Sequence, residues 1–136
     1  MEKHWKLSEE EFEENFSTCN FRPLWFTHEA HLRLAWMYIN KYGKEIAFEK
    51  YSEQLQAFAN KYNAEGKYNA TVTYASIQIM SRFIEKSEAY DFQDFINEFP
   101  ELKSKFKGLL TTHYSKDIFT SKEAKKHILQ PDLVSF

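Results

Sequence analysis

Glycine and proline, the residues that most readily interrupt helices, are scarce in this chain. Three glycines and three prolines occur among 136 residues, roughly 4% together against a usual share of about 12%. Turn-rich β architectures, collagen-like repeats and disordered segments contain more of both residue types. The scarcity favours a helical fold, and 13 Phe, 8 Tyr and 3 Trp provide the side chains for an aromatic core.

Capping residues and apolar spacing place the first two helices. Ser8 and Glu11 form a capping-box pattern that predicts a short helix ending near Phe16. Thr27 is a favourable N-cap for a second helix that ends at Gly43. Apolar residues in this second segment follow the i, i+3, i+4, i+7 spacing of one helix face: Leu32, Ala35, Trp36 and Ile39.

The same signals predict a third helix over 44–62, a break at 63–66 and a fourth helix over 69–86. Shorter helices are expected in the remainder: one capped by Asp91, one with Pro100 at its first position and Gly108 at its end, and others beginning at Ser115 and Ser121. No repeat or linker-like stretch interrupts the chain. We therefore expect an all-α, single-domain helical bundle over residues 1–136.

Charge and apolar run lengths argue against several classes of partner. Lys and Arg number 18 against 20 Asp and Glu, whereas nucleic-acid binding favours a basic excess. Apolar stretches fall short of the roughly 20 residues that a membrane span needs, and the first six residues do not resemble a signal peptide. The single cysteine, Cys19, excludes an internal disulfide and fits a reducing compartment. We expect a soluble, cytoplasmic protein without nucleic-acid partners.

The short connections between the second, third and fourth helices predict that consecutive helices run antiparallel. The second and fourth helices would then begin at the same end of the bundle. Two histidines, His28 and His31, lie at the start of the second helix. Polar residues at the start of the fourth are expected to face the same ligand: Tyr68, Asn69, Thr71 and Thr73.

Helix N-termini favour anions and disfavour imidazolium, so neutral histidines are expected there. His28 and His31 are the candidate catalytic residues, and three interpretations stay open. They could bind a divalent metal ion with help from His113, Glu29 or Glu65, although no third ligand lies nearby in sequence. They could instead serve acid–base chemistry or anion binding without a metal, or form structural hydrogen bonds.

The sequence resembles a family of small, uncharacterised bacterial proteins over residues 21–135. The resemblance rests on the segments 26–38 (Phe-Thr-His-Glu-Ala-His-Leu-Arg-Leu-Ala-Trp-Met-Tyr), 66–73, 113–115 and 130–133. The matching positions are His28, His31, Arg33, Trp36, Tyr68, Thr71 and Thr73. Asn69 and Ala70 differ, because family members tend to have His and Glu there. This departure favours ligand binding over catalysis.

Two functions follow from these patterns. The first is a site for a small anionic or polar ligand at the shared N-terminal ends of the second and fourth helices. Arg33 would pair with an anionic ligand, while Tyr68, Asn69, Thr71 and Thr73 orient it. The second is a non-enzymatic interaction module or homo-oligomer that uses an exposed aromatic face: Trp5, Phe12, Phe16 and Phe21. His4 and His127 are interpreted as ordinary surface residues.

Overall fold

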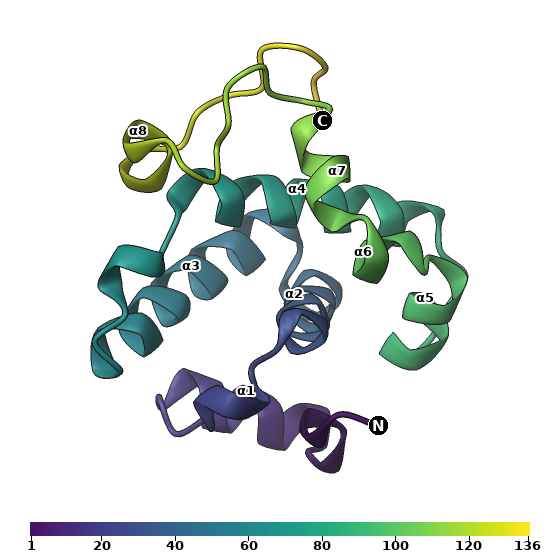
Figure 1. The fold of residues 1–136 in the computed structure, drawn as a ribbon. Coiled ribbons are helices and arrows are strands. Elements are labelled where there is room, and N and C mark those ends of the chain that lie inside the picture. The colour runs from purple at the N-terminus through teal and green to yellow at the C-terminus, as the bar shows by residue number, and fades with distance from the viewer. The chain divides into compact units, whose positions relative to one another are not determined.

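The computed structural model covers residues 1–136 and confirms the all-α prediction (Figure 1). Helices take up 67% of the chain, no strand is present, and five of the eight α-helices have seven or more residues. None of them combines the length and the apolar character needed to cross a membrane. The chain divides into two compact units, Met1–Lys67 (unit 1) and Tyr68–Phe136 (unit 2). The expectation of a single domain stays a prediction.

Capping interactions define the helices of unit 1. The Ser8 hydroxyl accepts from the Glu11 N–H, and the Glu11 side chain accepts from the Ser8 N–H, which confirms the capping box. Thr27 caps the second helix as expected, and Gly43 joins it to the third with a φ of +82°. The elements of unit 1 are η1 (Lys3–Lys6), α1 (Glu9–Ser17), η2 (Pro23–Trp25), α2 (His28–Tyr42), α3 (Lys44–Lys61) and η3 (Glu65–Lys67).

Aromatic rings from α1, α3 and the segment between α1 and α2 pack together in unit 1. The Phe16 ring stacks on Phe58 at 5.2 Å between centroids and lies 4.7 Å from Phe26. Phe21 lies 4.5 Å from Phe12 on the neighbouring side of this cluster. Phe12, Phe16 and Phe21 are at most 1% exposed, so the expectation that they form an exposed aromatic face is wrong. Their large apolar area stabilises unit 1 from within.

In unit 2, α4 packs against α7 and α8. The segment after α8 contacts the residues that follow α7 through a hydrogen bond and a ring stack. The His113 Nδ1–H donates to the Val134 carbonyl at 2.6 Å, and the His113 ring stacks on Phe136. The helices of unit 2 are α4 (Ala70–Lys86), α5 (Phe92–Glu98), α6 (Glu101–Ser104), α7 (Phe106–Thr111) and α8 (Lys122–Lys126).

The short helices of unit 2 agree only in part with the sequence pattern. Asp91 and Ser121 cap α5 and α8 as expected. Pro100 lies one position before the first residue of α6, and Gly108 lies inside α7 instead of ending a helix. Ser115 begins no helix, because its N–H and hydroxyl both donate to the Asp132 carboxylate. A polar contact 17 residues away therefore replaces the local cap that the sequence suggested.

Substitution of a buried ring tests the aromatic core of unit 1. We expect Phe16→Ala to lower the free energy of unfolding by about 3–5 kcal/mol, because it removes apolar contacts and leaves a cavity. Urea unfolding followed by circular dichroism measures the change. Leu24→Ala is the control, since Leu24 in η2 is 93% exposed and its loss should cost less than about 0.5 kcal/mol. Equal costs for the two variants would contradict the buried arrangement.

Candidate functional site

The first turn of α2 directs its side chains to different surroundings. Thr27 accepts from the Ala30 N–H through its hydroxyl and so fixes the start of the helix. His28 is exposed, Glu29 is buried and His31 is half-buried. On a helix with 3.6 residues per turn, residues 28 and 31 are neighbours on one side, whereas residue 29 points away from residue 31. The turn therefore presents one histidine to solvent and brings a carboxylate into the core.

The His31 ring is held by a backbone carbonyl and an aromatic neighbour. Its Nδ1–H donates to the Thr27 carbonyl at 2.8 Å, and the ring stacks on Phe26 at 3.7 Å between centroids. The pKa of His31 is lowered to about 4, chiefly by burial and with a contribution from the charge of His28, while the hydrogen bond to Thr27 acts to raise it. His31 is thus neutral at pH 7. Because Nδ1 carries the proton, Nε2 holds the lone pair.

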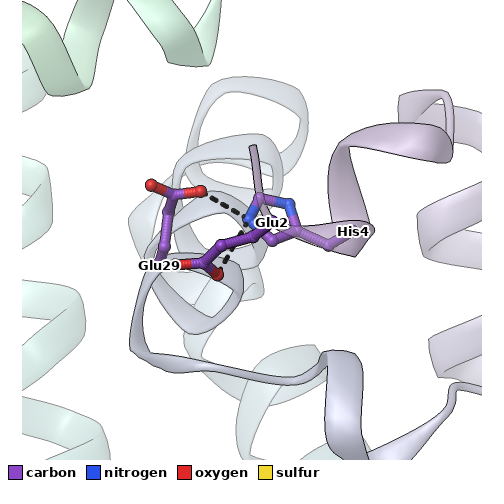
Figure 2. Close-up of side chains that lie close together, drawn as sticks. All are labelled: Glu2, His4 and Glu29. Atoms are coloured by element: carbon purple, nitrogen blue, oxygen red, sulfur yellow. Dashed lines mark hydrogen bonds and ion pairs between the residues drawn. The ribbon is translucent and has the colours of Figure 1, made fainter.

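His4 lies in the interior of the protein beside Glu29, so its interpretation as a surface residue is wrong (Figure 2). The distance from His4 Nε2 to Glu29 Oε1 is 2.7 Å, and the Trp5 Nε1–H donates to the same oxygen at 2.6 Å. Glu2 Oε1 lies 3.6 Å from His4 Nε2 and accepts from the Thr27 hydroxyl. An imidazole and two carboxylates therefore meet where η1 contacts the start of α2.

Arg33, one turn further along α2, binds the N-terminal segment. Its guanidinium is buried and donates to the carbonyls of His4 at 2.7 Å and Leu7 at 2.8 Å. It also lies over the rings of Trp5 and Phe12, at 5.2 and 5.1 Å from their centroids. These contacts use both terminal nitrogens of Arg33, the side chain that was expected to pair with an anionic ligand.

Arg33 also affects the state of the His4 ring. Its Nη1 lies 3.4 Å from His4 Nδ1. Burial is the main cause of the lowered pKa of His4 and the charge of Arg33 contributes, whereas Glu29 and Glu2 act to raise it. A cation beside Nδ1 and a carboxylate beside Nε2 together favour the neutral tautomer with the proton on Nε2. His4 therefore donates to Glu29.

The predicted site residues of the fourth helix belong to unit 2. Tyr68 and Asn69 directly precede α4, and Asn69 caps it by accepting from the Val72 N–H. Side chains of three predicted site residues, Asn69, Thr71 and Thr73, form further hydrogen bonds with backbone groups of unit 2. The bonds are Asn69 Nδ2–H to the Ile118 carbonyl, Thr71 hydroxyl to the His127 carbonyl, Leu129 N–H to the Thr71 hydroxyl and Thr73 hydroxyl to the Asn69 carbonyl. These bonds fix the start of α4 and the segment after α8.

Sequence reasoning thus found part of the arrangement in unit 1. His28 and His31 lie on one turn as expected, whereas the cluster around His4 was missed. One signal for it existed, because Arg33 interrupts the apolar run of α2 and a buried guanidinium requires acceptors. Nothing in the pattern of residues 1–6 indicated that His4 would lie beside Glu29. The expected meeting of the second and fourth helix starts stays a prediction.

The chain was compared with protein-family models, curated proteins and solved structures. No protein-family model, curated protein or solved structure matches the chain. The resemblance to a small bacterial family therefore stays a prediction.

The lowered pKa of His31 predicts acid destabilisation. Unfolded His31 takes up a proton near its ordinary pKa of 6.5, whereas the folded form resists protonation down to about 4. The unfolded state therefore binds more protons, and stability falls as the pH drops through this window, by on the order of 2 kcal/mol. In His31→Asn, which keeps a donor for the Thr27 carbonyl, we expect a shallower fall than in the wild type.

Urea unfolding at pH 7, 5.5 and 4.5 measures this difference. His127→Asn is the control, because the His127 side chain is exposed; this variant should follow the wild type. A fall as steep in His31→Asn as in the wild type would show that His31 does not contribute.

A second prediction concerns the contribution of the buried Arg33 guanidinium to stability. In Arg33→Met the carbonyls of His4 and Leu7 lose their charged donor, so we expect a loss of about 2–4 kcal/mol in the free energy of unfolding. Arg22→Met is the matched control: Arg22 is exposed and lies over the Trp25 ring, so its loss should cost less than about 1 kcal/mol. Urea unfolding at pH 7 compares them. A similar cost for both variants would mean that Arg33 does not hold the N-terminal segment.

Proposed function

We propose that the protein binds a small polar ligand at the first turn of α2, with His31 as hydrogen-bond acceptor and His28 beside it. One observation carries the proposal. The hydrogen bond from His31 Nδ1–H to the Thr27 carbonyl, at 2.8 Å, fixes the tautomer that leaves Nε2 as an acceptor. The stack on Phe26 holds the ring in place. A ligand that donates an N–H or O–H suits such a nitrogen.

The surrounding charges narrow the class of ligand. Glu29 lies in the first turn of α2, and the Glu2 carboxylate accepts from the Thr27 hydroxyl at the helix cap. These carboxylates already interact with the positive end of the helix dipole. They would repel a further anion, so we favour a neutral or cationic ligand over the anionic one that the sequence also allowed. Roles for Tyr68, Asn69, Thr71 and Thr73 in this site rest on the sequence alone.

The alternative of a helical interaction module has less support. The aromatic residues expected to form its surface include Phe12, Phe16 and Phe21, all of them buried. A cytoplasmic location belongs to the proposal, and it is supported by the single free cysteine, Cys19.

NMR spectroscopy of the histidine side chains tests the proposed site with two defined probes at pH 7. Acetamide is a neutral donor and inorganic phosphate is an anion. We expect acetamide to give a saturable shift of the His31 ring signals with a dissociation constant of roughly millimolar size, as its few atoms allow. Phosphate should bind more weakly. In His31→Phe the acetamide effect on the neighbouring backbone signals should disappear.

His127→Phe is the control and should leave acetamide binding unchanged, because this exposed side chain follows α8 in unit 2. An absence of saturable shifts at His31 with acetamide would overturn the proposal. Tighter binding of phosphate than of acetamide would overturn its preference for a neutral ligand over an anion.

A further inference from the structure

Three side chains of types that can bind metal ions lie close together between η1 and the start of α2. One donor atom each from Glu2, His4 and Glu29 lies within 4.8 Å of the others (Figure 2). Figure 2 shows both carboxylates directed at the same edge of the His4 ring. This group does not include His28 or His31, the residues that the sequence suggested as metal ligands.

The separations are close to those of a tetrahedral zinc site. Bonds of about 2.0–2.1 Å from zinc to nitrogen and oxygen place neighbouring ligand atoms about 3.3 Å apart. His4 Nε2 lies 2.7 Å from Glu29 Oε1 and 3.6 Å from Glu2 Oε1. An ion would have to open the first distance by about 0.6 Å and close the second by about 0.3 Å to reach this spacing.

The chemistry of the three donors selects a class of metal. Two carboxylates and one imidazole carry a charge of about −2 when both carboxyl groups are ionised, which a divalent cation balances. Imidazole nitrogen favours Zn²⁺ over Mg²⁺ and Ca²⁺, which prefer sets of oxygen ligands. Three protein ligands are the usual number in zinc sites that keep a fourth position for water. The Glu2 side chain is 37% exposed and gives the ion a route from solvent.

Neighbouring groups hold both carboxylates in position. The Trp5 Nε1–H donates to Glu29 Oε1 at 2.6 Å, and the Thr27 hydroxyl donates to Glu2 Oε1. Hydrogen bonds of this kind orient metal ligands and raise affinity. Together with the two distances from His4 Nε2 and the grouping of all three donor atoms within 4.8 Å, they carry the inference.

We propose that Glu2, His4 and Glu29 form a binding site for Zn²⁺. It uses different side chains from the polar-ligand site at His31 and does not depend on it. Binding replaces the proton on His4 Nε2 with the ion, and solvent returns a proton to Nδ1, so the ring stays neutral. Nδ1–H then faces Arg33 Nη1, 3.4 Å away. This unfavourable contact limits affinity, and we expect a dissociation constant of roughly micromolar size.

Isothermal titration calorimetry on the full chain, treated with EDTA, dialysed and free of added histidine tags, tests the site. We expect one Zn²⁺ per chain and no heat of binding with Mg²⁺. Glu2→Gln should weaken Zn²⁺ binding at least about 10-fold, and Thr27→Val by about 10-fold. His4→Gln should abolish binding. Because His4 is buried and this variant can fail to fold, Glu2→Gln, at a partly exposed position, decides the question.

Glu14→Gln is the matched control, since Glu14 is an exposed acid of α1 outside the cluster, and it should bind as the wild type does. His31→Asn and His28→Gln should also keep wild-type affinity for Zn²⁺. The proposal is overturned by an absence of Zn²⁺ binding or by wild-type affinity in Glu2→Gln. The proposal is also overturned if His28→Gln or His31→Asn loses Zn²⁺ binding while Glu2→Gln retains it, a result that would place the ion on those histidines. None of these zinc results changes the acetamide test of the His31 site.

Discussion

The buried guanidinium of Arg33 determines how the N-terminal segment of the protein is placed. A charged side chain within the apolar part of α2 needs hydrogen-bond acceptors, and the carbonyls of His4 and Leu7 supply them. The rings of Trp5 and Phe12 cover the guanidinium. Once η1 is held in this way, its side chains can reach the start of α2. The contacts of Glu29 with His4 and Trp5 thus depend on Arg33.

His4 lies between two charged side chains, Arg33 and Glu29, which have opposite effects on its pKa. Arg33 lies beside Nδ1 and Glu29 beside Nε2, so the neutral ring is polarised with its proton toward Glu29. The same Nε2 and Glu29 oxygen are the atoms that a zinc ion would take. Proton and metal therefore compete for one position. Arg33 favours the proton, whereas the carboxylate of Glu2 at 3.6 Å favours a divalent cation.

Features encoded by neighbouring residues were predictable, and features that depend on distant contacts were not. The Ser8 and Thr27 caps require only residues three positions away, and both are present. His4 contacts a residue 25 positions along the chain, and no local pattern carries that information. Gly108 shows a different limit, because a glycine weakens a helix by only about 1 kcal/mol and does not have to end it.

Thr27 shows why two candidate sites can share one helical turn without using the same groups. Its hydroxyl accepts from the Ala30 N–H and donates to Glu2. Its carbonyl accepts both the backbone N–H and the ring Nδ1–H of His31, as two lone pairs allow. The side chain thus supports the Glu2–His4–Glu29 group, while the backbone holds His31. A substitution that removes the hydroxyl acts on the first site and leaves the carbonyl for the second.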